Sequence, residues 1–327
     1  MKAIVRAQPG KQLTTMLVND LESGPAGPGQ IKVRMTSSRV NPVDVDLMAG
    51  FPGLKYKQPQ IGGIDGAGEV IEVGPEVTTF AVGDRVFFYR KFSDIGSWAQ
   101  EIVLGARDAA KIPAGVSLQD AGAIALPLLT AFDSIAQLQA RSGERILIHG
   151  AGGGVGFMAV QIAKAMGLHV IANASGRDRG DLERIGVDRF IDYKQEDFAQ
   201  VLIADPPDYI FDVVGGDTLK KSLRLGPKKV VSVMYADTTK LQKTGVELPV
   251  IFKFMMKLMM RKFRKAAERK GVELIGQVTG ADGALLQKAS DMLGQNTPVV
   301  RDYKTITLEE IRTKGFPERP AGLVILF

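Results

Sequence analysis

Short apolar, β-branched runs separated by glycine and proline dominate the chain up to about residue 115. IKVRM at 31–35 and EVIEVG at 69–74 are two of these runs. Turn-forming residues cluster between the runs, at 24–30, 62–68, 73–75 and 82–86. Such runs between glycine and proline clusters are typical of strands joined by tight turns. The pattern therefore predicts an all-β unit in the first part of the chain.

The pattern changes near Ser117. The stretch SLQDAGAIALPLLTAFDSIAQL (117–138) has helical periodicity. Strand-like and helix-like runs then alternate, in the order RILIHG, FMAVQIAKAMG, HVIANA, RGDLERIG, RFIDY, YIFDVVG and KKVVSVM. Because strands that alternate with helices form parallel sheets covered by those helices, this region is predicted to be a wound α/β unit.

The last part of the chain, from about Val272, returns to mixed signals. It contains the strand-like VELIGQV, a predicted helix at 281–294 and the apolar ending GLVILF at 322–327. A terminal apolar strand needs a pairing partner, and either of the two preceding units can supply one. No internal repeat and no low-complexity segment is evident.

The composition is that of a soluble globular protein, with 45% apolar and 24% charged residues. A chain of 327 residues suits two domains of ordinary size or one large domain. No run approaches the roughly 18 apolar, uncharged residues of a membrane span. The stretch 1–13 has no apolar segment of secretory length. We therefore expect a cytoplasmic protein.

The chain has no cysteine and two histidines, His149 and His169. Disulfides, thiolate nucleophiles and zinc sites with cysteine ligands are therefore excluded. The formal charge is +6. A charge of this size fits a polyanionic ligand or surface, although it also serves solubility alone.

A glycine cluster, IHGAGGGVG at 148–156, joins a strand-like run to a helical one. In a βαβ dinucleotide site, three small residues permit the tight turn, the approach of backbone to the pyrophosphate and the close packing of helix on strand. Ala151, Gly153 and Gly156 occupy these three places, and Gly154 and Val155 begin the helix whose N–H groups would face phosphate. A glycine-rich turn without a ligand is the alternative.

The end of the next strand reads VIANASGRDRG at 170–180. An NAD site places a carboxylate there for the ribose hydroxyls, whereas an NADP site offers cations and hydroxyls to the 2′-phosphate. Ala174 stands at the acid's place, and Ser175, Arg177 and Arg179 follow it. A guanidinium binds phosphate strongly. We therefore predict NADPH, with solvated surface arginines as the alternative.

Seven segments together resemble the medium-chain dehydrogenase/reductase superfamily, and its zinc-free quinone oxidoreductase branch in particular. They are RVNPVDVDLMAG, GGIDGAGEVIEVGPEV, FAVGDRVFF, LPLLTAFDSI, AGGGVGFMAVQIAKAMG, ASGRDRGDLERIGVDRFIDYKQEDF and FDVVGGDTL. The resemblance covers nearly the whole chain. It implies an α/β protein with a GroES-like β-barrel catalytic domain (1–118), a Rossmann NADPH-binding domain (119–271) and a C-terminal segment (272–327) that returns to the catalytic domain. It also implies a homodimer.

In the zinc-dependent relatives, the catalytic metal is held by a cysteine, a histidine and a second cysteine. By the resemblance, Asn41, Ile64 and Leu126 stand at these positions. None of the three can replace a thiolate or an imidazole as a zinc ligand. We therefore expect no metal site and no zinc-assisted alcohol oxidation.

The resemblance also assigns residues to the reaction. Asn41 and Thr130 are expected beside the nicotinamide and the acceptor. Backbone at Val214–Gly215 and Met234 is expected to contact the nicotinamide side, and Tyr193 to pack near the 2′-phosphate and adenine. Ordinary structural roles are the alternatives: a turn for Asn41, a helix position for Thr130 and a strand-end aromatic for Tyr193.

Two departures from the family pattern leave the proton donor open. Many relatives carry an aromatic or basic residue just after the NPVD motif, where this chain has Val45 and Asp46. Leu323 stands where the family's C-terminal glycine motif has a basic residue. Solvent is able to protonate a reduced quinone or an enolate after hydride transfer.

The stretch 250–270, VIFKFMMKLMMRKFRKAAERK, is predicted to be a strongly basic amphipathic helix. Three interpretations stay open. The helix is a cover over the cofactor cleft with adaptable methionines, a weak membrane anchor on anionic lipid, or a packed or dimer-contact helix with a solvated basic face.

The leading functional hypothesis is NADPH-dependent, metal-free hydride transfer to a quinone or related activated acceptor. An enone or alkenal double-bond reductase is the enzymatic alternative. An NADPH-binding protein with a crystallin-like or RNA-binding role is the alternative of another class. No specific nucleic-acid binding is expected, because the basic residues are not interleaved with aromatic residues in a base-stacking stripe.

Overall fold

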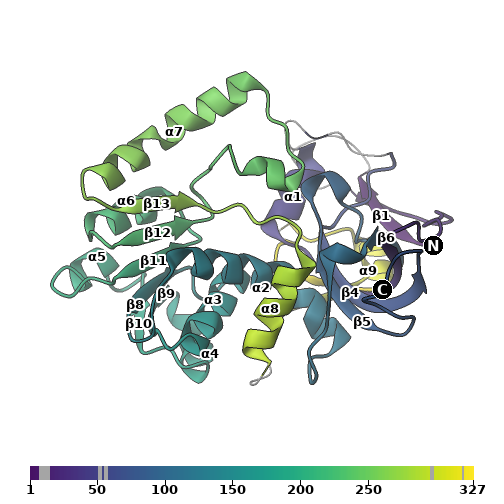
Figure 1. Ribbon diagram of the computed structural model, residues 1–327, viewed down its shortest axis with the longest axis horizontal. Coiled ribbons are helices and arrows are strands. Elements are labelled where there is room, and N and C mark those ends of the chain that lie inside the picture. The colour runs from purple at the N-terminus through teal and green to yellow at the C-terminus, as the bar shows by residue number, and fades with distance from the viewer. Residues whose placement is uncertain (7–14, 51–53, 55–57, 295–297, 319) are drawn as a thin grey trace. The chain divides into compact units, whose positions relative to one another are not determined.

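The computed structural model describes residues 1–6, 15–50, 54, 58–294, 298–318 and 320–327. The chain forms two compact units, coloured by residue number in Figure 1. Unit 1 comprises 1–126, 243–247 and 280–327, and unit 2 comprises 127–242 and 248–279. The stretch 1–13, in which we expect no secretory segment, lies largely outside the described residues.

Unit 1 is built on a seven-stranded sheet in which every pairing except that of β14 with β15 is antiparallel. Its path runs β14 (Thr305–Thr307), β15 (Val324–Leu326), β3 (Gln30–Arg39), β4 (Asp65–Val73), β5 (Arg85–Tyr89) and β7 (Ala109–Lys111), and β6 (Glu101–Gly105) also pairs with β3. A separate two-stranded sheet pairs β1 (Ala3–Arg6) with β2 (Thr15–Val18).

Alternation of side chains along β3 produces the core of unit 1. Ile31, Val33 and Met35 are buried and pack in one cluster with Val70 and Phe88 of the neighbouring strands. Because successive side chains of a strand point to opposite faces, this spacing of two gives the sheet one apolar face. The predicted strands are confirmed, but the unit is not all-β, because helix α1 (Pro42–Gly50) lies between β3 and β4.

Gly68, in the segment 62–68, serves close packing of strands. A Cβ atom on Gly68 would lie 2.0 Å from the carbonyl oxygen of Arg34 on β3. The backbone of β4 therefore approaches β3 at a place that only glycine permits.

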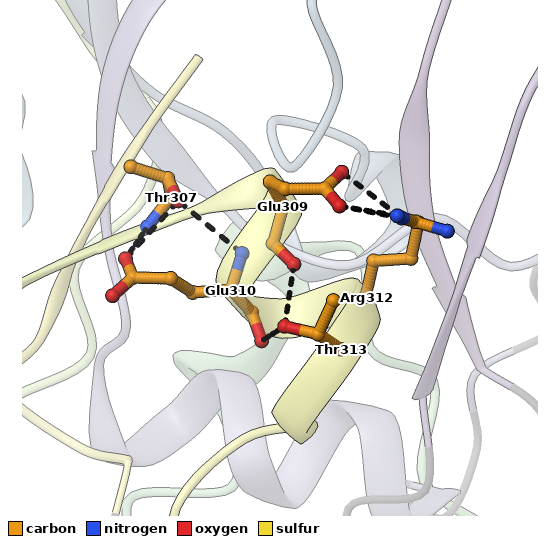
Figure 2. A network of polar contacts seen from close by, with 5 residues as sticks. All are labelled: Thr307, Glu309, Glu310, Arg312 and Thr313. Carbon is orange, nitrogen blue, oxygen red and sulfur yellow. Dashed lines mark hydrogen bonds and ion pairs between the residues drawn. The ribbon is translucent and has the colours of Figure 1, made fainter.

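Helix α9 (Leu308–Lys314) of unit 1 begins at a capping box, shown in Figure 2. The Glu310 N–H donates to Thr307 Oγ1 at 3.2 Å, and the Thr307 N–H donates to Glu310 Oε2 at 2.9 Å. Arg312 pairs with Glu309 on the same helix. These contacts satisfy N–H groups that otherwise lack partners at the start of a helix.

Unit 2 contains a six-stranded sheet in which every pairing is parallel. The spatial order is β10 (Arg189–Asp192), β9 (His169–Ala174), β8 (Arg145–His149), β11 (Tyr209–Asp212), β12 (Lys229–Ser232) and β13 (Glu273–Gly276). Numbered by sequence, this is the 3-2-1-4-5-6 order of a Rossmann sheet. The predicted fold class is confirmed.

Helices connect the strands of unit 2. They are α3 (Gly154–Ala165), α4 (Arg179–Arg184), α5 (Phe198–Val201), α6 (Gly216–Arg224) and α7 (Val250–Glu268). The remaining helices are α1 (Pro42–Gly50), α2 (Leu118–Leu138) and α8 (Gly283–Leu293), with short 3₁₀ turns at Phe92–Asp94, Ala106–Asp108, Gly176–Asp178 and Leu241–Thr244.

The elements of the segment 272–327 divide between the two units. β13 extends the parallel sheet of unit 2 beside β12, whereas β15 pairs with β3 in unit 1. The first change of unit along the chain falls inside α2, between Leu126 and Pro127, eight residues beyond the boundary expected at 118.

Helix α2 is long and apolar enough to cross a membrane, although Asp120 and Asp133 interrupt its apolar run. Among the described residues, only the most apolar window of this helix has such a length and composition. However, 78% of that window is buried inside the protein. A mostly buried apolar helix of this kind also occurs in the cores of soluble proteins.

Candidate cofactor site

A pocket of about 890 Å³ lies at the carboxyl ends of the parallel strands of unit 2. It is bordered by the glycine loop after β8, the end of β9, the loop between β10 and α5, and the start of α6. β8 and β11 are adjacent here, and the chain leaves them in opposite directions along the sheet. Open α/β sheets bind ligands at this switch point.

The glycine loop has the close backbone packing of a dinucleotide cradle. A Cβ atom on Gly156 would lie 2.2 Å from the carbonyl oxygen of Gly150 and 2.7 Å from Ala151 Cα. Gly150 itself has φ +67°, and its carbonyl accepts a hydrogen bond from the Gly153 N–H at 2.9 Å. Gly156 therefore fulfils the predicted role of the third small residue, which lets α3 pack on the strand.

The loop leaves room for a pyrophosphate at the start of α3. Gly150, Gly152 and Gly153 line the pocket, and Gly153 is the N-cap of this 12-residue helix without a side-chain hydrogen bond. The first N–H groups of a helix and its dipole favour an anion. Ala151 is fully buried beneath the loop. The residues present thus fit a dinucleotide.

The end of β9 contributes small and cationic residues to the same pocket. Ala174 and Ser175 are buried and line it, and Arg177 lines it with a side chain that is 82% exposed. Tyr193, which is 57% exposed, lies on the pocket as well. The structure therefore brings Ser175, Arg177 and Tyr193 together around one cavity.

Arg179 is directed elsewhere. Its Nη1 atom lies 3.3 Å from Glu183 Oε1, one helical turn further along α4, and its guanidinium carbon lies 4.4 Å from the centre of the Phe190 ring. Arg179 is not part of the pocket lining. This ion pair and cation–π contact provide a surface role for the side chain.

Asp178 is a pocket residue that the sequence did not indicate. It is 5% exposed, and a Cβ atom on Gly152 would lie 2.2 Å from its Oδ2 atom. Its Oδ1 atom lies 3.4 Å from Arg177 Nε. Any phosphate bound by Arg177 therefore competes with the Asp178 carboxylate for the guanidinium.

One carboxylate holds the two loops expected to contact the nicotinamide. Asp212 Oδ1 accepts hydrogen bonds from the N–H groups of Val214 and Gly215, both at 3.0 Å. Ser232 Oγ donates to Asp212 Oδ2 at 2.7 Å and accepts from the Met234 N–H at 3.1 Å. Asp212 thus orders both loops from the ends of β11 and β12.

These two loops also contact each other. A Cβ atom on Gly215, which has φ +72°, would lie 2.6 Å from Met234 Cβ. Val214 is 49% exposed and lines the pocket, and Met234 is 53% exposed. The sequence motif FDVVGGDTL contained the signal for Asp212, because an acid at the end of a strand before two glycines is suited to order a turn.

His149 is a buried structural residue of unit 2. Asn173 Nδ2 donates to His149 Nδ1 at 2.8 Å, and His149 Nε2 lies 2.8 Å from Ser222 Oγ. Burial lowers the pKa of His149 to about 4. The ring is therefore neutral near pH 7, with its proton on Nε2 and donated to Ser222. This agrees with the interpretation of His149 as a strand-end core residue.

Asn41 lies in unit 1 above a pair of buried carboxyl groups. Its N–H donates to Asp44 Oδ2 at 2.7 Å, and its Nδ2 donates to the Arg39 carbonyl at 3.4 Å. Asp65 Oδ2 accepts from the Leu126 N–H at 3.2 Å. Asp44 and Asp65 are both fully buried.

The environment of this pair favours protonated carboxyls. Burial raises the pKa of Asp65 to about 7. Burial and the neighbouring Asp65 also raise the pKa of Asp44 well above its usual range. Because two like charges in a dry site repel each other, the pair holds at least one proton near neutral pH.

Thr130 lies on α2 in unit 2, is half-buried, and accepts a hydrogen bond at its carbonyl from Ser134 Oγ at 2.6 Å. Asn41 belongs to unit 1, so the expected meeting of these two residues at the nicotinamide stays a prediction. The positions expected for zinc ligands hold buried apolar side chains at Ile64 and Leu126. Among the described residues, no three histidines, cysteines or carboxylates are grouped to bind a metal ion.

Two family models match the chain. An alcohol dehydrogenase GroES-like domain matches residues 27–114, and a zinc-binding dehydrogenase domain matches residues 154–262. The first match falls in unit 1, and the second falls in unit 2 except for residues 243–247.

The curated relatives include proteins of which the chain covers about 70% and much longer polyketide synthases. A quinone oxidoreductase of Pseudomonas aeruginosa is 33% identical over 71% of this chain and 72% of that protein. A 2-haloacrylate reductase of a Burkholderia species is 32% identical over 68% of this chain and 69% of that protein. Two mycocerosic acid synthase-like polyketide synthases, from Mycobacterium tuberculosis and Mycolicibacterium smegmatis, are 37% and 35% identical, but the chain spans only 9% and 11% of their length.

Solved structures share the whole fold. Quinone oxidoreductases from Coxiella burnetii and Pseudomonas syringae pv. Tomato are each 25% identical and match 100% of this chain and 99% of theirs, with TM-scores of 0.76 and 0.77. Full-length agreement in fold and the two matched domains lead to one assignment. The chain belongs to the medium-chain dehydrogenase/reductase family, in its quinone-oxidoreductase-like group.

Proposed function

We propose that the protein is an NADPH-dependent reductase that transfers hydride to a quinone or a related activated acceptor without a metal ion. The observation that carries the proposal is the composition of the pocket at the end of β9. Ala174 and Ser175 stand where an NAD site needs a carboxylate, and Arg177 lines the same cavity. This combination favours a cofactor with a 2′-phosphate.

The protein's own groups have three roles in this reaction. The start of α3 receives the pyrophosphate, and Ser175 and Arg177 receive the 2′-phosphate. Asp212 orders the loops at Val214–Gly215 and Met234, which orient the nicotinamide. The bound cofactor supplies the hydride, so the protein has to provide position and exclusion of water.

Absence of a metal is compatible with the acceptors proposed. Asn41, Ile64 and Leu126 lack the thiolate and imidazole groups that zinc requires. In quinones and enones the incoming charge moves onto an oxygen, which hydrogen bonds can stabilise. The Asn41 amide is our candidate for that hydrogen bond, and Thr130 for contact with the acceptor. Solvent then supplies the proton.

A second enzymatic candidate is reduction of an activated carbon–carbon double bond. The 2-haloacrylate reductase among the relatives favours this possibility, because its name describes an alkene conjugated to a carboxylate. Both reactions deliver hydride to an electron-poor acceptor, so the two candidates differ in substrate and not in cofactor chemistry. A non-catalytic NADPH-binding role is the third possibility. We also expect a cytoplasmic homodimer, which light scattering would test.

The first experiment measures oxidation of NADPH and NADH with a panel of quinones, enones and 2-haloacrylates. Turnover of quinones with NADPH supports the proposal, and turnover of alkenes alone supports the second candidate. If no acceptor is reduced while NADPH binds, the non-catalytic role is favoured.

The second experiment tests the cofactor preference with Arg177→Ala. Loss of a charge-assisted contact with the 2′-phosphate should raise the KM for NADPH about tenfold and leave the KM for NADH nearly unchanged. Arg184→Ala is the matched control, because Arg184 is an exposed residue of α4 that pairs with Asp181 and does not line the pocket. Equal effects of Arg177→Ala on both cofactors would rule out this role of Arg177.

A further inference from the structure

We propose that the N-terminal half of α7 is a membrane-docking helix that inserts its apolar side chains into the interface of an anionic lipid surface. No residue of α7 lines the pocket, and the proposal does not depend on the proposed reaction. It decides between the three interpretations that the sequence left open for this segment.

The first observation is an unusually exposed apolar stretch. Six large apolar side chains in the first ten residues of α7 are each at least half exposed: Val250 83%, Ile251 66%, Phe254 66%, Met255 52%, Leu258 58% and Met259 61%. Single exposed apolar residues are ordinary, but a contiguous set on one helix marks an interaction site.

The helix is anchored at its other end. Phe263 and Ala267 are buried in the core cluster of unit 2, and Met260 and Ala266 pack against this cluster. α7 contacts α6 and β13 of the same unit, and in Figure 1 its C-terminal end lies nearest to α6. The C-terminal half therefore has a buried face that stabilises the helix, whereas the outward apolar residues of the N-terminal half have no such role in the fold.

The exposed residues form one face. At roughly 100° per residue, Ile251, Phe254, Met255 and Leu258 fall within about a third of the helix circumference. The buried residues Phe263 and Ala267 lie on the opposite side. The helix thus has two apolar faces, one packed against its own unit and one directed outward.

The second observation is the charge beside this face. Lys253, Lys257, Arg261 and Arg264 recur at intervals of three or four residues and so form a row along one border of the outward face. No acidic residue occurs between Glu247 and Glu268. Among the described residues, the single ion pair of this row joins Arg264 Nε to Glu268 Oε1 at 3.7 Å.

This charge distribution favours a lipid surface over a second copy of the chain. In a twofold contact the same patch meets itself, so the basic rows of two α7 helices would face each other and repel. An anionic membrane instead supplies the complementary charge, about 1 kcal/mol per basic residue near the surface, and accepts the apolar side chains. Helices with an apolar face and a basic border bind membranes in this way.

The test is sedimentation of the full-length protein with vesicles of phosphatidylcholine alone or mixed with phosphatidylglycerol. We expect the protein to sediment with the anionic vesicles and to stay mostly in the supernatant with the neutral ones. Binding should weaken as salt is raised. Lys253→Gln with Lys257→Gln should reduce binding on the order of tenfold. Lys220→Gln with Arg224→Gln, the same change of charge at exposed positions of α6, is the matched control and should bind as the unaltered protein does.

A second measurement detects insertion of the apolar face. The chain has one tryptophan, Trp98, which is fully buried. In Phe254→Trp, the emission of the introduced indole should shift to shorter wavelength with anionic vesicles and not with neutral ones. Phe254→Ser with Leu258→Ser should lose binding while the circular dichroism spectrum stays unchanged.

Three outcomes would overturn the proposal. Equal recovery of the protein in the supernatant with both vesicles excludes docking. Binding that persists in the double serine variant, together with an unshifted emission in Phe254→Trp, shows adsorption by charge alone. Conversion of a dimer to a monomer by the serine substitutions, without vesicle binding by the unaltered protein, assigns the face to a second copy.

Discussion

Asp65 shows how a single buried side chain couples this fold to pH. Its carboxyl is fully buried beside Asp44, and burial raises its pKa to about 7 from a usual value near 3.8. The folded protein therefore binds more protons than the unfolded chain between these two pH values. In that window the free energy of unfolding falls as pH rises, and it levels off above about pH 7.

Asp65→Asn removes this titration and keeps an oxygen that can accept from the Leu126 N–H. We expect the urea midpoint of the unaltered protein to fall between pH 5 and pH 8, and that of Asp65→Asn to fall less. A smaller slope remains in the variant because the pKa of Asp44 is raised as well. Asp302→Asn, at an exposed position of unit 1, is the control and should follow the unaltered protein. If the urea midpoints of all three proteins fell equally with pH, Asp65 would not be the group that titrates.

At the residue scale, the sequence could predict those residues of the candidate site whose role depends only on the steric requirements of a single turn. Ala151, Gly153 and Gly156 follow from the steric needs of one turn, and Gly156 fulfils its expected role. Asp178 was not predictable, because its contact with Gly152 depends on how the loop after β9 folds back over the glycine loop. For the same reason Arg179 could not be separated from Arg177 by sequence, since the direction of each side chain depends on the first turn of α4.

The step from strand to helix at β8 and α3 is the element on which the proposed cofactor binding depends. The start of α3 approaches the Gly150 carbonyl so closely that a Cβ atom on Gly156 would lie 2.2 Å from it, whereas a Cβ atom on Gly153 would lie 3.4 Å from the same oxygen. The two glycines belong to one loop, yet only Gly156 is required by packing of the helix on the strand.

Gly156→Ala should therefore displace α3 and lower the free energy of unfolding by about 1–3 kcal/mol, the usual cost of overpacking. Gly153→Ala is the matched control and should cost less than about 1 kcal/mol, because its Cβ meets an ordinary contact. Urea unfolding without cofactor measures both values, so that effects on binding do not enter. A similar cost for the two variants would show that the approach of α3 to β8 is not rigid.

Periodicity predicted the type of most elements because each run carries its own spacing of apolar residues. The strand of period two at Ile31, Val33 and Met35 and the alternating strands and helices after Ser117 are examples. The sheet to which each strand belongs could not be predicted in this way. β13 and β15 both read as short apolar strands, and long-range pairing places the first in unit 2 and the second in unit 1. No local pattern encodes that choice.

At the scale of the whole molecule, the proposed site for the cofactor's adenosine half lies within one unit. Every described residue that lines the pocket belongs to unit 2, from the glycine loop to Lys221. A fragment that carries the pyrophosphate and the 2′-phosphate, but no nicotinamide, should therefore be bound by unit 2 alone. We use 2′-phospho-ADP-ribose as this fragment and ADP-ribose as its matched control.

Hydrogen exchange should show protection of amides at 150–156 and 174–179 with 2′-phospho-ADP-ribose, and no change in the strands β3 and β4 of unit 1. At 100 times its Kd, the ligand should add about 2.7 kcal/mol to the free energy of unfolding of the unit that binds it. ADP-ribose at the same concentration should add less, because Ser175 and Arg177 gain no phosphate partner. If both ligands stabilise equally, the end of β9 does not select the 2′-phosphate. If protection extends to β3 and β4, the adenosine half is not bound by unit 2 alone.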